Sequence, residues 1–308
     1  MRKPKALERG ARVAVFAPAS PGGEAKVAAG VAELKRLGFA AELPAARRAE
    51  GYFAGSAEAR RAEFMKLLGD TKVDALVGLR GGYGSNYLLD AKLASAVGEP
   101  KAVIGFSDLS SLQIFLWQQY RWVTFYGPMV AAGLAAGAGA ANGYDEESLR
   151  MSISELSAGW RISLRGEALA GGQAEGRLLG GAMTMVEATF GTPWELDTRG
   201  AILVLEDRGM KPYQVDRALM HFQQAGKLEG VKGIVLGDFP DCEPPMADSP
   251  TVHDVCARIL GPLGVPVVFG APVGHTLRPM LTIPLGVTAR LHAQGDGTLE
   301  ILEATATR

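Results

Sequence analysis

The sequence predicts an α/β protein of two domains, a parallel sheet covered by helices on both faces and a smaller α+β domain. In the first half, short apolar strands alternate with amphipathic helices, which is typical of a doubly covered parallel sheet. A run rich in Ala and Gly then interrupts this pattern, and the second half mixes strand directions. We therefore expect an N-terminal α/β domain at 1–130, a linker region at 131–174 and a C-terminal domain at 175–308.

The expected strands of the first half end in loops that carry polar residues. We expect strands at residues 12–17, 39–43, 75–79, 102–104 and 122–125. Helices with apolar residues three or four positions apart are expected at 24–37 and 57–68, from Ser85 onward, and from Leu109 to Tyr120. Ligands of parallel sheets bind at the carboxyl ends of the strands. Pro18, Arg80 and Ser107 follow three of these ends, so we expect the functional site there.

The second half is expected to open at about Glu175 with a Gly-rich entry at residues 176–181. Before it, the run at 131–143 (AAGLAAGAGAANG) predicts a mobile connector. Helices are expected at 146–156, 182–190, 213–225 and 253–260, and strands at 160–164, 200–205, 233–236 and 265–269. Residues 282–284 and 288–292 are expected to form an antiparallel finish ahead of a last strand at 299–303.

Composition excludes several classes of function. The net charge is −1, with 47% hydrophobic and 21% charged residues, so we expect no nucleic-acid partner and no membrane partner. Cys242 and Cys256 do not form a C-x-x-C motif and are expected to be reduced thiols. We find no signal-peptide core and no apolar stretch long enough to span a bilayer, so we expect a cytoplasmic protein. The scattered histidines predict no metal site.

The strand-to-helix turn Gly105-Phe106-Ser107-Asp108 is the strongest local candidate for chemistry. A serine at such a turn can hold its hydroxyl clear of the backbone, and the start of the next helix supplies free N–H groups. The G-x-S-x-G pattern of a nucleophile elbow is incomplete, because Leu109 replaces the second glycine. Serine is also a preferred N-cap, so a helix start at Ser107 or Asp108 is the alternative.

The loop at residues 80–84 (RGGYG) has adjacent glycines after a strand. Its backbone N–H groups suit an oxyanion hole shared with the amide of Asp108, and a tight turn without a ligand is an equal alternative. As a phosphate loop it lacks the Lys-Ser/Thr ending, and Tyr87 occupies the third glycine position of G-x-G-x-x-G. Arg80, a bidentate donor beside the expected site, is a candidate for binding a substrate carboxylate.

Two candidates in the second half also follow strands. Glu206 and Asp207 end a strand, where carboxylates serve function or cap a helix; a solvated loop neutralised by Arg208 is the alternative. His275 lies in a loop directly after Gly274, so backbone positions it, and an imidazole with a pKa of ~6.5 suits a general base. A loop histidine without a role is the alternative.

Together, Ser107, Glu206 and His275 follow strands in the order nucleophile, acid, base. Serine needs an adjacent base to become nucleophilic, and the base needs an acid to fix its tautomer. The combination favours a serine hydrolase over the separate alternatives.

The chain resembles the murein LD-carboxypeptidases, which are serine peptidases with a Ser-Glu-His triad. The resemblance covers nearly the whole chain in order, through VAVFAPASP, RGGYGS at Arg80, IGFSDLSSL around Ser107, TFYGPM, GTPWELDTRGAILVLEDRGMKPYQVDR around Glu206 and PVGHTLRPMLTIPLG around His275. It implies a Rossmann-like N-terminal domain, a smaller β-rich core in the C-terminal domain, an active site between them, and a homodimer.

The resemblance also implies a reaction and the residues that perform it. The nucleophile, acid and base would be Ser107, Glu206 and His275, and the oxyanion hole would use the amides of Asp108 and of Gly81 or Gly82. The reaction would cleave the amide between the L-centre of a diamino acid and a terminal D-Ala in muropeptides recycled from the cell wall. It would need no metal or organic cofactor. Either diaminopimelate or lysine fits the implied diamino acid.

Other functions remain as alternatives to an LD-carboxypeptidase that acts on muropeptides. The nearest resembles the microcin C immunity peptidases, which cleave aminoacyl-nucleotide analogues with the same triad; an added aromatic loop for the nucleobase is not obvious near Glu206. A non-catalytic muropeptide binder and a phosphate-binding α/β protein are the others. Ala182 departs from the family, which often has Asn at this position after two glycines, and this puts one polar substrate contact in doubt.

Overall fold

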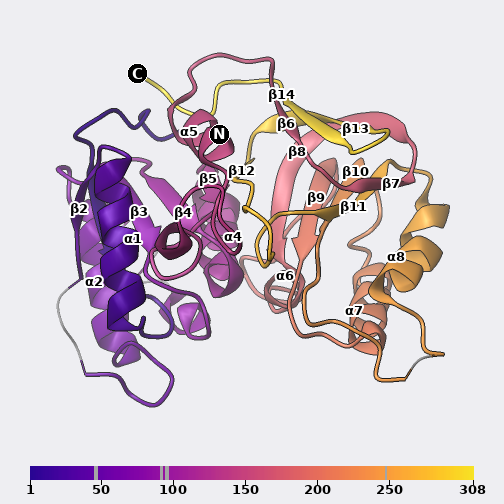
Figure 1. The fold of residues 1–308 in the computed structure, drawn as a ribbon, viewed down its shortest axis with the longest axis horizontal. Coiled ribbons are helices and arrows are strands. Elements are labelled where there is room, and N and C mark those ends of the chain that lie inside the picture. The colour runs from indigo at the N-terminus through magenta and orange to yellow at the C-terminus, as the bar shows by residue number, and fades with distance from the viewer. Residues whose placement is uncertain (45–47, 91–92, 94–96, 247) are drawn as a thin grey trace.

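The computed structural model describes residues 1–44, 48–90, 93, 97–246 and 248–308, and it contains two sheets that lie side by side (Figure 1). In the described part of the chain, the first sheet has the strand order β12-β5-β4-β3-β1-β2 and the second β6-β14-β13-β8-β9-β10-β11-β7. The predicted fold class is confirmed, with a largely parallel sheet in the N-terminal half and a mixed sheet in the C-terminal half. The exact domain boundaries stay predictions.

The N-terminal strands of the first sheet are short, mostly buried and parallel to one another. They are β1 Arg12–Phe16, β2 Ala40–Glu42, β3 Ala75–Gly78, β4 Ala102–Gly105 and β5 Thr124–Tyr126. After β2 the chain returns to the other side of β1, so the strand order reverses between β1 and β3. The carboxyl ends of the strands at such a reversal border the ligand crevice of an open parallel sheet.

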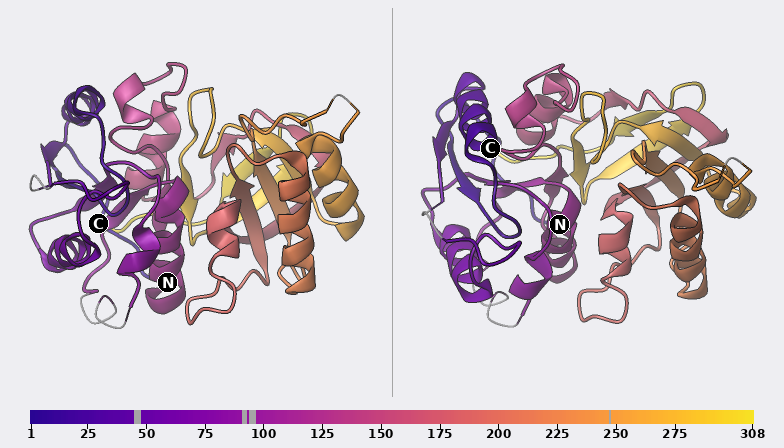
Figure 2. Two further views of the ribbon diagram at one scale, coloured as in Figure 1. Left: turned by 90° about the horizontal axis from the view of Figure 1, so that it is seen from below. Right: turned by 60° about the horizontal axis from the view of Figure 1, so that its bottom comes forward.

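Helices cover both faces of the first sheet. They are α1 Glu24–Arg36, α2 Ala57–Gly69 and α4 Ser110–Tyr120, with 3₁₀ turns η1 Ser85–Leu88, η2 Ser107–Leu109 and η3 Leu134–Ala136. α1 lies on one face and α2 on the other (Figure 2), as right-handed crossovers on either side of β1 require. The helix expected from Ser85 is a 3₁₀ turn, and residues 91–92 and 94–96 lie outside the described residues. No helix in the described ranges is long and apolar enough to cross a membrane.

The second sheet has a parallel centre with antiparallel strands at its flanks. Its strands are β6 Trp160–Ser163, β7 Glu167–Ala170, β8 Gly172–Ala182, β9 Ala201–Glu206, β10 Gly233–Gly237, β11 Val267–Ala271, β13 Thr288–Ala293 and β14 Thr298–Ile301. The helices of this half are α5 Glu146–Ser154, α6 Met183–Glu187, α7 Pro212–Gln224, α8 Val252–Leu260 and η4 Gly261–Leu263. β9 is buried on both faces: Leu203 packs in a cluster with α7 and α8, and Val204 faces the other core.

The strands of the second half differ from the expectation in two places. Residues 176–181, expected as a Gly-rich entry with no strand assigned to it, form part of β8, and a side chain at Gly180 would place its Cβ 2.0 Å from the carbonyl oxygen of Val204. β12, at Ile283–Leu285, does not pair with β13 but lies antiparallel to β5 in the first sheet. A strand from the C-terminal half therefore completes the N-terminal sheet.

The run at 131–143, expected as a mobile connector, is tied by backbone hydrogen bonds to the C-terminal half. The N–H of Asn142 donates to the carbonyl of Leu277 at 2.9 Å, and the N–H of Met280 donates to the carbonyl of Gly143 at 3.1 Å. The run therefore packs between the two halves along one side of the crevice.

Leu109 explains how the turn at Ser107 closes without a second glycine. Leu109 is fully buried, and a Cβ on Gly78 or on Gly105 would lie only 2.4 Å from its Cδ2 atom. The two strand glycines, on β3 and β4, therefore make the space that the elbow needs for a large residue.

We expect Leu109→Ala to lower the free energy of unfolding by about 2–5 kcal/mol, because it leaves a cavity that strand glycines cannot fill. Urea unfolding followed by circular dichroism measures the change. Leu156→Ala is the matched control, since Leu156 is 45% exposed and its loss should cost less than about 0.5 kcal/mol. Equal effects of the two substitutions would contradict this account of the turn.

Candidate active site

Ser107 occupies a strained turn between β4 and the helix that follows. Its φ is +63°, in the left-handed region that non-glycine residues rarely adopt. Its N–H donates to the hydroxyl of Tyr126 at 3.3 Å, and its carbonyl accepts from Ser110 Oγ at 2.7 Å. A helical turn does begin at Ser107, as the alternative predicted, but neither η2 nor α4 has a side-chain cap, so the Ser107 hydroxyl caps no helix. Left-handed geometry of this kind presents a nucleophile in the elbow of α/β hydrolases.

Asp108 connects this turn to the glycine loop. Its buried carboxylate accepts from the N–H of Gly84 at 3.2 Å and from the N–H of Ser85 at 2.8 Å. The carboxylate therefore holds the loop at 80–84 rather than capping its own helix. The backbone N–H of Asp108 lies in the first turn of η2, where amides lack partners within the helix.

Gly81 and Gly82 pack directly against the serine and its neighbours. A Cβ on Gly81 would lie 3.0 Å from Ser107 Oγ, and a Cβ on Gly82 would lie 2.3 Å from Ser20 Oγ. The Gly81 carbonyl accepts from the N–H of Ser20 at 3.2 Å. Because the two groups of a trans peptide point in opposite directions, the Gly82 N–H points away from Ser20. Both glycines line the cavity that contains Ser107.

Glu206 is the last residue of β9 and is completely buried. Backbone lies directly against its side chain on two sides. A Cβ on Gly237 would lie 2.4 Å from Glu206 Cβ, and a Cβ on Gly274 would lie 2.3 Å from Glu206 Cδ. Gly274 also has φ +63°, so it meets both a steric and a conformational requirement for glycine.

His275 is hydrogen-bonded to Glu206 through two of its nitrogens. Its backbone N–H donates to Oε2 at 2.9 Å, and its Nδ1 lies 2.9 Å from Oε2 and 3.2 Å from Oε1. An ionised carboxylate only accepts, so Nδ1 carries the proton and Nε2 of the neutral ring has a free lone pair. Burial lowers the pKa of His275, but the charge and hydrogen bond of Glu206 outweigh burial and raise it above the usual value. The Phe106 ring, next to Ser107 in the chain, packs edge-on at 5.1 Å from the imidazole.

Asp207 serves a different purpose from its neighbour. Its carboxylate accepts from the N–H and Oγ of Thr184, at 2.9 and 2.8 Å, and from the N–H of Arg208 at 2.8 Å. Burial raises the pKa of Asp207. The Arg208 side chain pairs instead with Asp241 at 2.6 Å. The solvated-loop alternative is therefore wrong for both Glu206 and Asp207.

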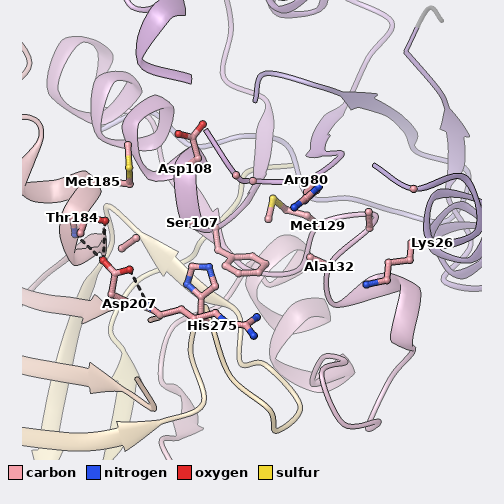
Figure 3. Close-up of a pocket in the computed structure, with 17 residues that line it drawn as sticks. Lys26, Arg80, Ser107, Asp108, Met129, Ala132, Thr184, Met185, Asp207 and His275 are labelled. Atoms are coloured by element: carbon pink, nitrogen blue, oxygen red, sulfur yellow. Dashed lines mark hydrogen bonds between the residues drawn. The ribbon is translucent and has the colours of Figure 1, made fainter. Parts of the chain in front are cut away.

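The candidate residues meet at a cavity of about 740 Å³ between the two halves. Figure 3 shows Ser107 and His275 turned toward this cavity, with Arg80 and Lys26 on another side of it. Arg80, which is exposed, donates from Nη1 to the carbonyl of Pro21 at 3.1 Å. Lys26 makes no ion pair or hydrogen bond to the described residues. The N-terminal half thus contributes the serine, the glycine loop and two cations.

The structure brings the predicted site residues together and adds some that sequence reasoning missed. Ser107, Asp108, the two loop glycines, Arg80 and His275 line the cavity, and Glu206 lies behind His275. Tyr126 and Ser110, which bind the backbone of Ser107, were not singled out. One sequence feature could have identified Tyr126: it places a hydroxyl group at the carboxyl end of an apolar strand, which in the structure lies beside β4.

Fold and cavity define a class of protein, a two-domain α/β protein with a serine, a histidine and a buried glutamate at one cleft. The family model of the LD-carboxypeptidase N-terminal domain matches residues 13–127, and that of the LD-carboxypeptidase C-terminal domain matches residues 175–291. The chain belongs to the LD-carboxypeptidase family.

Named relatives agree with this assignment. A Bacillus subtilis protein named as a probable murein peptide carboxypeptidase is 32% identical over 294 residues, covering 94% of this chain and 91% of its own. The murein tetrapeptide carboxypeptidase of Pseudomonas aeruginosa is 31% identical over 276 residues, covering 86% of this chain and 88% of its own.

Solved structures show the same fold. The muramoyltetrapeptide carboxypeptidase of Oxalobacter formigenes superposes with a TM-score of 0.81 at 28% identity, covering 96% of this chain and 100% of its own. The microcin C7 self-immunity protein MccF superposes with a TM-score of 0.88 at 22% identity, with both chains fully covered. At that identity the second likeness shows the fold alone.

We expect Gly274→Ala to abolish most reactivity of Ser107, because the new methyl group would occupy the place of the Glu206 carboxylate. Labelling of Ser107 with a serine-reactive phosphonate, followed by intact-protein mass spectrometry, measures it. Gly264→Ala is the matched control: its φ of +69° gives the same backbone strain, but nothing lies within 4 Å of its Cβ. Equal labelling of the two variants would contradict the proposed place of Glu206 in the site.

Proposed function

We propose that this protein is a serine-type LD-carboxypeptidase that removes a terminal D-Ala from muropeptides through an acyl-enzyme. One observation carries the proposal: fully buried Glu206 accepts both the backbone N–H and the Nδ1–H of His275, whose ring borders the same cavity as Ser107. This arrangement fixes the tautomer in which Nε2 can accept a proton from serine. The family and its murein-cleaving relatives support the choice of substrate.

The proposed reaction has two halves that share one base. In the first, Ser107 Oγ bonds to the carbonyl carbon of the diamino acid while its proton passes to Nε2 of His275. The amides of Asp108 and of Gly82 or Gly81 stabilise the oxyanion. The C–N bond then breaks, and His275 gives its proton to the departing amine of D-Ala. In the second half, water loses a proton to His275 and attacks the ester; the bond from the acyl carbon to Oγ then breaks and His275 returns the proton to Oγ, which frees the shortened peptide and restores Ser107.

The charges of the cavity support a peptide with carboxylates as substrate. Arg80 lies beside the glycine loop, where the carboxylate of the departing D-Ala is expected, and Lys26 and Arg208 also line the cavity. Among the described lining residues, Phe106 and His275 provide the only rings. A nucleobase would need an aromatic partner for stacking, so this lining favours a muropeptide over an aminoacyl-nucleotide analogue.

The proposed cellular setting rests on the family resemblance and, for the compartment, on the sequence features described above. We propose that the protein is a homodimer that acts in the cytoplasm on recycled muropeptides, with no metal or organic cofactor. Either diaminopimelate or lysine fits the diamino acid of this substrate.

We expect Ser107→Ala to lower kcat on murein tetrapeptide by a factor on the order of 10⁴ to 10⁶, because the nucleophile is lost. Mass spectrometry of the products, looking for the loss of one alanine, measures it. Ser111→Ala is the control: Ser111 is buried one turn away on α4, and its Oγ has no described hydrogen-bond partner. Wild-type turnover by the Ser107 variant would refute the mechanism.

Two further outcomes would point to the alternative functions. Cleavage of an aminoacyl sulfamoyl adenylate but not of tetrapeptide, in parallel assays, would favour an immunity peptidase. The absence of any phosphonate adduct on wild-type Ser107, together with tetrapeptide binding, would favour a non-catalytic binder.

We expect Arg80→Ala to raise KM for tetrapeptide about tenfold or more while kcat changes little, since a charge-assisted hydrogen bond is worth about 1.5–3 kcal/mol. Steady-state kinetics at constant ionic strength measures both constants. Arg199→Ala removes an equally positive side chain that is 75% exposed and lies outside the cavity, so it controls for net charge. An unchanged KM in the Arg80 variant would remove this residue from the substrate site.

A further inference from the structure

Tyr126 connects the two halves of the site from beneath the cavity. It is the last residue of β5, lies opposite Gly105 of β4 in the sheet, and is completely buried. Its hydroxyl donates to Glu206 Oε1 at 2.5 Å and accepts from the N–H of Ser107 at 3.3 Å. One phenol thus bonds both to the nucleophile's backbone and to the acid that orients the base.

The carboxylate of Glu206 depends on this hydroxyl. Its Oε2 atom accepts from two nitrogens of His275, whereas Oε1 receives its shorter hydrogen bond from Tyr126. A buried carboxylate that lacks hydrogen-bond donors favours its protonated form, and its side chain rotates toward other donors. Tyr126 therefore supplies the donor that comes from outside the His275 loop.

The backbone of Ser107 is held on both sides by groups that reach the other half. Its N–H binds Tyr126, which binds Glu206, and its carbonyl binds Ser110 Oγ, which accepts from the N–H of Ala182 at 3.0 Å. A residue at φ +63° persists only where its surroundings determine its conformation. These two chains of hydrogen bonds provide that constraint and link it to the position of the acid.

We propose that Tyr126 is a positioning residue that couples the geometry of the Ser107 turn to the charge and orientation of the Glu206–His275 pair. The proposal rests on the proposed function, in which Ser107 is the nucleophile and His275 its base. Tyr126 does not line the cavity, so it acts through Ser107 and Glu206 rather than by touching substrate. A phenylalanine would fill the same space but could make neither bond.

The expected consequence of losing the phenol is a change in the titration of His275. Burial and the nearby Glu206 charge raise the pKa of Tyr126 well above its usual value, so the phenol keeps its proton and remains a donor. The Tyr126 hydrogen bond stabilises the negative charge of Glu206. Without it, the carboxylate depends more on a protonated imidazole beside it, so the pKa of His275 rises further. Asp207, which raises this pKa, and Arg208, which lowers it, are unchanged by the substitution.

The experiment compares Tyr126→Phe with wild type over a range of pH. On the high-pH plateau of the pH–rate profile, the rate of phosphonate labelling of Ser107 should fall about tenfold or more. The acid limb of this profile, where protonation of His275 slows the labelling, should move to higher pH by about half a unit or more. An NMR titration of the His275 ring should show the same upward movement. Thermal unfolding of each variant reports whether the fold is kept.

Tyr144→Phe is the matched control. Tyr144 is also completely buried, and its hydroxyl donates to a glutamate, Glu33, at 2.7 Å and accepts from Arg36 at 3.2 Å. Removing this hydroxyl deletes the same chemical group at a site that the mechanism does not use. The labelling rate and the acid limb should therefore match wild type.

A second substitution tests the sign of the effect and keeps the fold. The phenol of 3-fluorotyrosine is more acidic and donates more strongly, so placing it at position 126 should move the acid limb to lower pH. A double-mutant cycle with Glu206→Gln tests the route: Tyr126→Phe should change the labelling rate much less once the carboxylate is gone.

Distinct results would overturn the two proposals separately. If Tyr126→Phe labels more slowly at every pH with an unmoved acid limb and an unmoved His275 titration, the phenol is only structural and the coupling is wrong. Full additivity with Glu206→Gln would also overturn it. If wild-type Ser107 takes no phosphonate at all, the proposed function fails, and the His275 titration alone decides whether Tyr126 acts on the pair.

Discussion

The Glu206 carboxylate, buried at the end of β9, requires hydrogen-bond donors and space from the residues around it. Glu206 has no solvent exposure, and an ion there costs several kcal/mol unless donors replace its lost water. His275 provides two donors and Tyr126 a third. Gly237 and Gly274 lack side chains where any Cβ would collide with the glutamate. The ends of several strands are thus shaped around one side chain.

The same carboxylate ties the halves of the molecule together. Tyr126 reaches it from the first sheet, and Ser110 of α4 accepts from Ala182 at the end of β8. β12 adds a C-terminal strand to the N-terminal sheet, next to β5. These contacts make the interface part of the core rather than a hinge, which suits chemistry that needs a serine and a base held within hydrogen-bond reach. Ala182, where the resemblance led us to expect Asn, contributes its backbone N–H to this interface.

Local patterns allowed much of the fold to be predicted, and contacts between distant residues explain where prediction failed. The strands of the first sheet and the helix after Ser107 have clear periodicity, because each is defined by its own residues. The pairing of β12 with β5 has no such signature, since either partner would bury the same apolar residues. The glycines at 176–181 did not indicate a strand, yet they lie in β8, because β9 packs too closely for side chains at positions such as Gly180.

The sequence by itself determined the α/β alternation, the residue types at the strand ends and the family to which the chain belongs. Sequence reasoning chose Glu206 as the acid, but only the tertiary structure placed its carboxylate, rather than that of Asp207, against His275. Successive residues at a strand end point to opposite sides, and packing selects between them. The tertiary structure also decided that Tyr126 joins the site, since its partner Glu206 lies 80 positions away in the chain. Hydrogen bonds over such separations exist only once the two sheets are packed together, and no local sequence pattern encodes them.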